Sequence, residues 1–147
     1  QEMSRGLGDV YKRQALDHLS KKDPGLNSGL MILQYTSASL VSANKQLAAP
    51  SSIDSITSSN GQEDHVSMGA NGANQLRDII NNLYEIFAIE LITAIQAKEF
   101  NNHKTSDLID EFISTVRKIH PKISSDRVFH NDINKVSKFL KKNRRVA

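Results

Sequence analysis

The stretch from Ile86 to Ala97 constrains the fold more than any other part of the chain, because it is apolar around nearly its whole circumference. Glu90 is its only charged residue. A helix of this kind in a soluble protein has to be enclosed, either by its own domain or by other subunits. Since the chain has only 147 residues with which to wrap it, we expect other copies of the chain to supply part of the cover.

The residues just before this stretch carry the clearest periodicity in the sequence. Apolar side chains recur there at the spacing of an α-helix with one buried face; they are Leu76, Ile79, Ile80, Leu83 and Phe87. The pattern predicts one long helix that begins near Glu63 or Asp64 and reaches about Phe100, with Gly69 and Gly72 weakening its first turns.

The remaining elements are also predicted to be helical, because no run of alternating β-branched residues is long enough for a sheet. One helix is expected from about Leu30 to Leu47, after a turn-rich segment and before Pro50. Two amphipathic helices are expected further on, the first capped by Ser106 and stopped by Pro121, the second starting near Asp132. Their predicted buried faces are Leu108, Ile109, Phe112, Ile113, Val116 and Ile119 in the first, and Ile133, Val136, Phe139 and Leu140 in the second.

A polar, serine-rich stretch separates the first two predicted helices, between Ala48 and Gly61. It is too long for a plain connection between helices. Loops of this length in a compact domain are usually functional or disordered.

Composition excludes several classes of protein. The sequence has no cysteine, so it can form neither a disulfide framework nor a thiolate metal site, and its five histidines fall at no recognisable metal-binding spacing. We therefore expect no metal, and the absence of cysteine fits a cytoplasmic location. The basic C-terminal end is more commonly a solvated terminus than a surface for nucleic acid or lipid, so neither partner is expected.

Residues 86–97 are also too few to cross a membrane, which takes about 20 apolar residues. We expect no secretory signal, because the given N-terminus has no continuous apolar core after its basic residues.

Residues 1–14 look foreign to the rest of the chain. The segment from Ser4 to Gln14 resembles an in-frame translation of a sequencing-library transposon adapter, and every codon of the adapter string matches. Such segments are excluded before the fold is considered. The native sequence is therefore expected to begin near Ala15, and residues 15–147 to form the folded portion.

One motif resembles a known family. The segment Asn60-Gly61-Gln62-Glu63-Asp64-His65-Val66-Ser67-Met68-Gly69 is similar to the Gln-Glu-Asp-His-Val-Ser-Met signature of the histidine ammonia-lyases, a branch of the aromatic amino acid lyase family. The similarity covers essentially all of Ala15 to Leu140, although Ala43 stands where the family commonly has Glu. Phenylalanine and tyrosine ammonia-lyases usually read Asn-Gln-Asp at this place. These lyases and the related aminomutases are the alternatives within the family.

The resemblance implies that residues 15–147 are the C-terminal helical part of an all-α, fumarase/aspartase-like helix bundle, assembled as a homotetramer with active sites built from more than one subunit. The implied reaction is the non-hydrolytic elimination of ammonia from L-histidine to give trans-urocanate, the first step of histidine degradation. The family's electrophilic cofactor is 4-methylidene-imidazol-5-one (MIO), formed from an Ala-Ser-Gly tripeptide. This sequence contains no such tripeptide, because Ala38-Ser39 is followed by Leu40, so the chain alone is expected to be inactive.

Two residues match the family's active-site positions, Gln62 and Glu63. Glu63 is the expected catalytic residue, because a carboxylate in a lined pocket can bind the substrate's ammonium or imidazole group, or transfer a proton once burial raises its pKa. Gln62 is expected to orient substrate or cofactor through its amide. The competing interpretation makes both of them polar residues at a helix start, where the helix dipole stabilises a carboxylate. Asp64 is expected to cap the helix and His65 to be a packed or hydrogen-bonded ring.

A function of another class remains as the runner-up. The chain could be a non-catalytic helical interaction module whose basic tail contacts an acidic partner. On that hypothesis the match to the lyase motif is a coincidence and nothing depends on an Ala-Ser-Gly segment.

Overall fold

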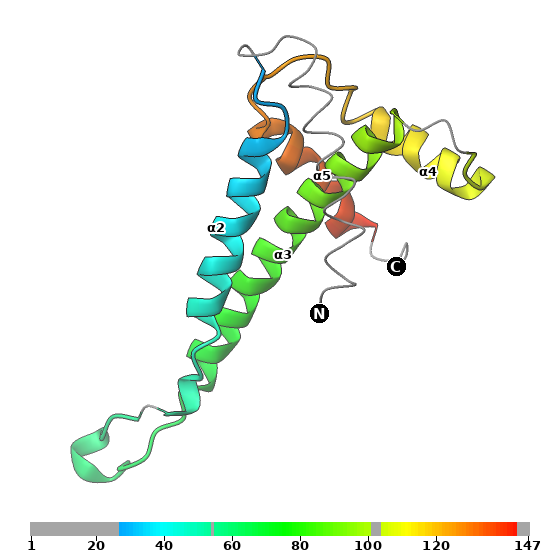
Figure 1. The fold of residues 1–147 in the computed structure, drawn as a ribbon. Helices are drawn as coiled ribbons and strands as arrows, with labels where there is room; N and C mark the ends of the chain where they lie inside the picture. The colour runs from blue at the N-terminus through cyan, green and yellow to red at the C-terminus, as the bar shows by residue number, and fades with distance from the viewer. Residues whose placement is uncertain (1–26, 54, 101–103, 144–147) are drawn as a thin grey trace. The chain divides into compact units, whose positions relative to one another are not determined.

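The computed structural model describes residues 27–53, 55–100 and 104–143. Four α-helices lie in these ranges, in the order α2 (Met31–Leu47), α3 (Gly69–Lys98), α4 (Asp107–Arg117) and α5 (His130–Lys142) (Figure 1). Two short 3-10 helices, η1 (Ser51–Ile53) and η2 (Ser59–Gly61), lie between α2 and α3. The described residues contain no strand, which confirms the all-α prediction. The predicted boundary at residues 14 and 15 lies outside the described residues.

The chain divides into two compact units, and α2 and α3 contribute residues to both. We call residues 38–83 the loop unit, because they contain the segment between α2 and α3. The rest of the described chain, which includes α4, α5 and the ends of α2 and α3, is called the core unit.

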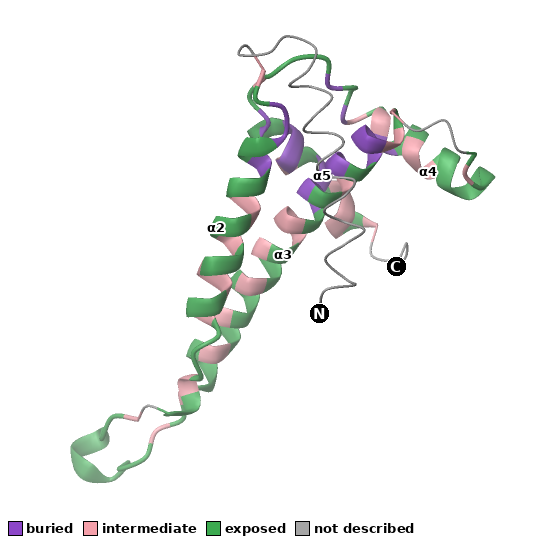
Figure 2. Cartoon of the chain, in the orientation of Figure 1, coloured by how far each residue is buried: buried purple, intermediate pink, exposed green. Residues whose placement is uncertain are grey.

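All the buried apolar residues of the described chain belong to the core unit (Figure 2). Each valine, leucine, isoleucine or phenylalanine side chain among them contributes about 1.5–3 kcal/mol when it is fully buried. The chain therefore encloses much of the predicted apolar segment itself, although Phe87 remains 52% exposed. The buried set is Leu30, Leu33, Ala88, Ile89, Ile92, Ile95, Ala97, Val116, Ile123, Phe129, Ile133 and Val136.

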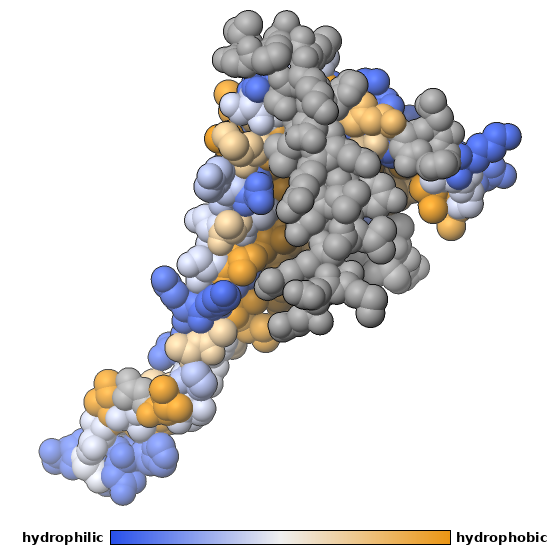
Figure 3. All heavy atoms as spheres, in the orientation of Figure 1, coloured by the Kyte–Doolittle hydropathy of each residue, from blue (hydrophilic) through white to orange (hydrophobic). Residues whose placement is uncertain are grey.

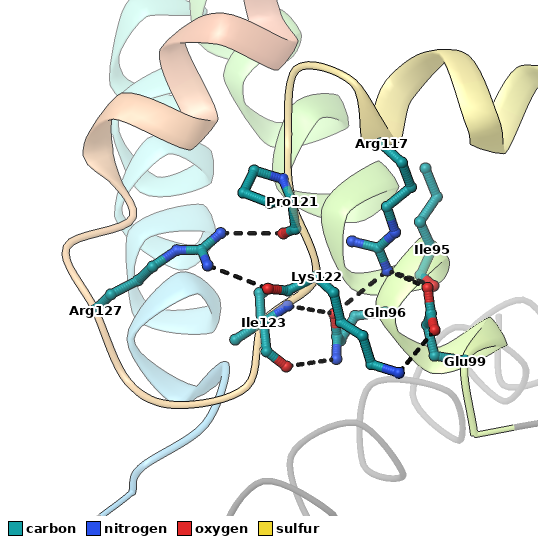
Figure 4. A network of polar contacts seen from close by, with 8 residues as sticks. All are labelled: Ile95, Gln96, Glu99, Arg117, Pro121, Lys122, Ile123 and Arg127. Carbon is teal, nitrogen blue, oxygen red and sulfur yellow. Dashed lines mark hydrogen bonds and ion pairs between the residues drawn. The ribbon is translucent and has the colours of Figure 1, made fainter.

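A polar network joins α3 to the end of α4 and the segment after it (Figure 4). The fully buried amide of Gln96 donates to the carbonyl of Ile123 at 3.0 Å and accepts from the Ile123 amide at 3.1 Å. Arg117 and Lys122 both contact the carboxylate of Glu99, at 3.0 and 2.9 Å. The Lys122 hydrogen bond, with help from the charge of Arg117, holds the pKa of Glu99 below its usual value. The buried amide of Gln96 is thus paired with the segment after α4, and the ion pairs of Glu99 add contacts to Arg117 and Lys122.

The start of α5 is held by a second set of polar contacts. Arg127 donates to the carboxylate of Asp132 at 3.0 Å and to the carbonyls of Pro121 and Lys122 at 3.2 and 3.3 Å. His120 is fully buried beside it, with Nδ1 3.4 Å from a carboxylate oxygen of Asp132 but with no hydrogen bond to either ring nitrogen. Burial lowers the pKa of His120, and the nearby Asp132 only partly opposes this. The neutral imidazole is therefore the form that the fold accommodates.

The turn just before α2 is held by a residue from far away in the sequence. Asp126 accepts hydrogen bonds from the backbone amides of Ser28 and Gly29, at 2.5 and 2.9 Å, and its own amide donates to the side chain of Asn27 at 2.9 Å. The first turn of α2 contains no acidic residue of its own. The carboxylate of Asp126 satisfies two backbone N–H groups of the turn that leads into α2, and its negative charge lies on the side of the positive helix end.

The predicted bounds hold for some helices and not for others. The helix predicted from about Leu30 to Leu47 is confirmed as α2. The long helix is confirmed, but its predicted start near Glu63 is wrong, because α3 begins at Gly69. The residues before Gly69 satisfy their backbone groups within the loop instead, and the Ser67 hydroxyl accepts the Gly69 amide at 3.3 Å.

The cap predicted for α4 is also wrong in detail. Ser106 occupies the cap position, but its side chain makes no capping hydrogen bond. The hydroxyl of Thr105 donates instead to the carboxylate of Asp110. The last helix begins at His130, two positions before the predicted Asp132.

The predicted buried faces are the largest departure from expectation. Along α3, Leu76 is 56% exposed, and Ile80, Leu83 and Phe87 are also exposed. The reason is that other positions of α3, Gln75 and Asn82, make the contacts within this chain. On α4 only Val116 is buried, while Leu108 is 77% exposed. On α5 the prediction holds for Ile133 and Val136, and Phe139 and Leu140 pack against the core while partly buried.

Candidate functional site

The loop unit pairs the second half of α2 with the first half of α3. The side-chain amide of Asn82 donates to Asn44 at 2.8 Å, and the hydroxyl of Ser51 donates to Gln75 at 2.7 Å. These two hydrogen bonds hold α3 against α2 and against the start of the loop. The loop runs from Ala48 to Met68, between the end of α2 and the start of α3, and it carries the motif.

The tip of this loop is a tight turn closed by its own backbone. The amide of Ser58 donates to the carbonyl of Glu63 at 2.8 Å, and the Glu63 amide donates back at 3.3 Å. Two further amides, those of Gly61 and Gln62, donate to the carbonyls of Ser58 and Ser59 at 3.1 and 3.2 Å. The backbone on both sides of Gln62 is therefore fixed.

The turn places three consecutive residues in the left-handed region. The φ angles of Ser59, Asn60 and Gly61 are 54°, 56° and 86°. Glycine adopts this region readily and asparagine tolerates it, whereas serine does so at a cost. Strained residues of this kind cost about 1–3 kcal/mol each and concentrate at functional sites.

One side chain joins the two ends of the turn at Ser55 and Val66, and we call this pair of positions the neck of the loop. The hydroxyl of Ser55 accepts the amide of Val66 at 2.8 Å and donates to the carbonyl of Val66 at 3.2 Å. Ser55 and Val66 are both half-buried. No sequence pattern singles out Ser55, because the stretch also contains Ser51, Ser52, Ser58 and Ser59.

Gln62 and Glu63 lie side by side at this turn, and both are exposed. Neither side chain makes a hydrogen bond or ion pair with the described residues. The expected lined pocket around Glu63 is therefore not formed by this part of the chain. The competing interpretation of Glu63 as a helix-start carboxylate is also wrong, because α3 begins six positions later, at Gly69.

The two residues that follow differ from expectation as well. Asp64 precedes the helix by five positions and is exposed, so it does not cap α3. His65 is exposed rather than packed. It lies on the rim of a pocket of about 420 Å³ in the loop unit, lined by Ser51, Ser52, His65, Val66, Ser67, Met68, Gly69 and Gly72.

Apolar side chains also reach the surface of the loop unit, on the helices as well as in the loop (Figure 3). Ile53 and Ile56, which flank Ser55, are 81% and 65% exposed. Large apolar residues that are exposed close together usually mark a surface that another molecule covers.

The residues present do not fit the formation of a cyclised tripeptide cofactor. Ala38, Ser39 and Leu40 lie inside α2, where the backbone is committed to helical hydrogen bonds, and the third residue is not glycine. Among the described residues no cluster of histidine and acidic side chains could hold a metal ion. Within the same ranges, no helix has the length and apolar character to span a membrane.

Comparison with known proteins agrees with the motif. Residues 7–118 match the family model described as aromatic amino acid lyase. Over 124 residues, which are 81% of this chain, the sequence is 51% identical to a histidine ammonia-lyase of Staphylococcus aureus. That alignment takes in only 24% of the relative, so the chain spans about a quarter of the length of the curated relatives it matches.

Solved structures of the family also match the fold. The histidine ammonia-lyase of Trypanosoma cruzi superposes with a TM-score of 0.79 and 38% identity, covering 94% of this chain and 29% of that one. A tyrosine aminomutase from Streptomyces globisporus superposes with a TM-score of 0.77 and 29% identity over the same shares. The fold of this chain is thus similar to the matching part of these proteins.

Proposed function

The chain belongs to the aromatic amino acid lyase family, and we propose that it is part of a histidine ammonia-lyase that eliminates ammonia from L-histidine to give trans-urocanate. The observation that carries the proposal is the turn at residues 58–63, which presents Gln62 and Glu63 on a backbone held in a strained conformation. Over the same 94% of this chain, the identity to a histidine ammonia-lyase is 38% and the identity to a tyrosine aminomutase is 29%, which supports this substrate over tyrosine.

Glu63 acts on the substrate in this proposal. The proton on the β-carbon is weakly acidic, so the reaction requires both an electrophile and a base. The carboxylate of Glu63 either binds the ammonium or imidazole group or moves a proton, and the amide of Gln62 orients the substrate. MIO supplies the electrophile when it is formed, from an Ala-Ser-Gly tripeptide in a part of the protein outside this sequence.

Assembly completes the site. Glu63 is exposed in the single chain, so the walls that enclose a substrate come from elsewhere in the complete protein or from other copies. We place the enzyme in the cytoplasm as a homotetramer. The exposed apolar side chains of α3, Leu76, Ile80 and Leu83, support contact with other copies, and the absence of cysteine fits the location.

The interaction-module hypothesis has little left to support it. It required the motif to be a coincidence, but the family model matches residues 7–118 rather than a short segment.

The test starts from the complete reading frame in the source DNA. That frame is expected to encode an Ala-Ser-Gly segment and further lyase-like sequence ahead of Ala15, and the absence of both would contradict the proposal. The 147-residue chain alone is expected to produce no urocanate.

Kinetics of the complete enzyme then test Glu63. Glu63→Gln is expected to lower urocanate formation, followed by absorbance, about 10²–10⁴-fold, the range for losing a positioned acid or base. Glu111→Gln, an exposed glutamate on α4, is the matched control and is expected to behave as wild type. A rise in KM alone would identify Glu63 as a binding group, a fall in kcat as a group that acts in the chemical step. Wild-type rates for Glu63→Gln would remove it from the mechanism.

A further inference from the structure

The position of Glu63 depends on the backbone of the loop and not on its own side-chain contacts. Its carboxylate makes no hydrogen bond or ion pair with the described residues, and the same is true of the Gln62 amide. The position of such a side chain is set by the position of its backbone. What closes the loop therefore sets where the carboxylate stands.

Two closures hold the loop, at its tip and at its neck. The tip is the pair of backbone hydrogen bonds between Ser58 and Glu63, at 2.8 and 3.3 Å. These bonds fix the shape of the turn, but they move with it and do not anchor it to the rest of the protein. The neck is the double contact of Ser55 with Val66, which joins positions eleven residues apart.

The neck is the anchor because of what it connects. Ser55 follows η1, and η1 is tied to α3 by the hydrogen bond between Ser51 and Gln75. Val66 leads into α3, which begins at Gly69. Among the described residues, no other side chain makes a hydrogen bond between the backbone segment that enters the turn and the one that leaves it. A single hydroxyl thus joins the incoming and outgoing backbone at the base of the turn.

We propose that Ser55 is a positioning residue that fixes the carboxylate of Glu63 through the neck of the loop. The inference rests on the proposed catalytic role of Glu63. A hydroxyl is suited to this task because it donates and accepts at once, and both backbone groups of Val66 use it. A displacement of about 1 Å in a group that acts on a substrate can cost about 10²-fold in rate.

The experiment is a mutant cycle in the complete enzyme. Ser55→Ala is expected to change the same kinetic parameter as Glu63→Gln, by about tenfold, the equivalent of one hydrogen bond of about 1.4 kcal/mol. Ser55→Thr keeps the hydroxyl and is expected to restore the rate to within about twofold of wild type. Thr57→Val, which removes an exposed hydroxyl of the same loop that makes no hydrogen bond with described residues, is the matched control and is expected to be silent.

The cycle separates positioning from a general loss of stability. In the Glu63→Gln background, Ser55→Ala is expected to lower the rate no further, because the group that it positions is already gone. An additive loss would overturn the inference. Should Ser55→Ala reduce the yield of folded enzyme, amide hydrogen exchange on the folded fraction gives a second measurement. Val66 is expected to exchange faster than in wild type, and unchanged exchange would also count against the neck.

Failure of this inference and failure of the proposed function look different. If Glu63→Gln abolishes activity and Ser55→Ala matches wild type, only the role of Ser55 is withdrawn. If Glu63→Gln itself is silent, the proposed role of Glu63 fails and the positioning role fails with it.

Discussion

Different interactions stabilise the two units of this chain. In the core unit, apolar residues from α2, α3, α4, α5 and the segment before α5 bury one another, and the buried amide of Gln96 has partners for its donor and its acceptor. In the loop unit, none of the described residues is buried (Figure 2). The loop unit is held by helix pairing, backbone turns and a few side-chain hydrogen bonds.

The long helix α3 shows that composition does not explain this difference. Its two halves both carry isoleucine and leucine at helical spacing, yet Ile92 is fully buried and Leu76 is 56% exposed. What differs is how much of the helix surface the rest of the chain covers. In the half of α3 that belongs to the loop unit, Leu76, Ile80 and Leu83 stay exposed in this chain.

Truncating one apolar residue in each half of α3 is expected to give the largest difference in stability between the two units. Ile92→Ala is expected to destabilise the chain by about 2–5 kcal/mol, as for other buried residues of this size, whereas Leu76→Ala is expected to change it by less than about 0.5 kcal/mol. Urea denaturation of the isolated chain measures both values. In the complete enzyme Leu76→Ala is expected to weaken assembly, which size-exclusion chromatography follows. Equal losses in the isolated chain would contradict the division into a covered and an uncovered half.

Lowering the pH is expected to destabilise the fold through His120 in the core unit. Burial lowers the pKa of His120 below its ordinary value of 6.5, so the folded state resists a proton that the unfolded chain accepts. Stability is therefore full above about pH 6.5 and falls as the pH drops from there toward the folded pKa. Asp132, Arg117 and Arg127 are the charged groups that act on this imidazole. Denaturation at about pH 7.5, 6.5 and 5.5 measures the slope, and His120→Leu is expected to flatten it. A wild-type curve that is already flat over this range would count against the buried imidazole as its source.

Two glycines in the loop unit give the smallest and most discriminating test. Gly61 has a φ of 86°, so Gly61→Ala is expected to cost about 1 kcal/mol although nothing crowds the added methyl group. Gly72 lies in α3, and an added Cβ would sit 3.8 Å from Ser51, an ordinary contact. Gly72→Ala is expected to stabilise by about 0.5–1 kcal/mol, the helical preference of alanine over glycine. Thermal unfolding measures both, and the same sign for the two variants would show that backbone conformation is not what separates them.

Periodicity predicted the helices well, because an apolar stripe is a local property of the sequence. It placed most of α3 and found the amphipathic helices that became α4 and α5, whereas α2 was bounded by the turn-forming residues before it and by Pro50 after it. Burial was predicted less well. The stripe containing Leu76 and Ile80 was recognised as a buried face, but the sequence does not say whether the chain itself or another molecule covers it.

The motif residues were found through resemblance, and their setting was not. Gln62 and Glu63 were identified by their place in the signature, but the turn that presents them depends on backbone angles at Ser59 and Asn60 that propensity does not predict. The start of α3 was predicted six positions too early because the loop satisfies its backbone groups locally, through contacts such as that of Ser55, which no pattern of residues marks.

The carboxylate that holds the turn before α2 has a consequence for how the protein is made. Asp126 lies 97 positions downstream of Gly29, so this turn leaves the ribosome long before its partner exists. Closing so long a loop costs little more than closing a shorter one, since each doubling of length adds only about 0.6 kcal/mol. The order of synthesis, and not the entropy of loop closure, therefore decides when this contact can form. A nascent chain that stops before Asp126 leaves the amides of Ser28 and Gly29 without this partner, and the core unit can be completed only when α5 has been synthesised.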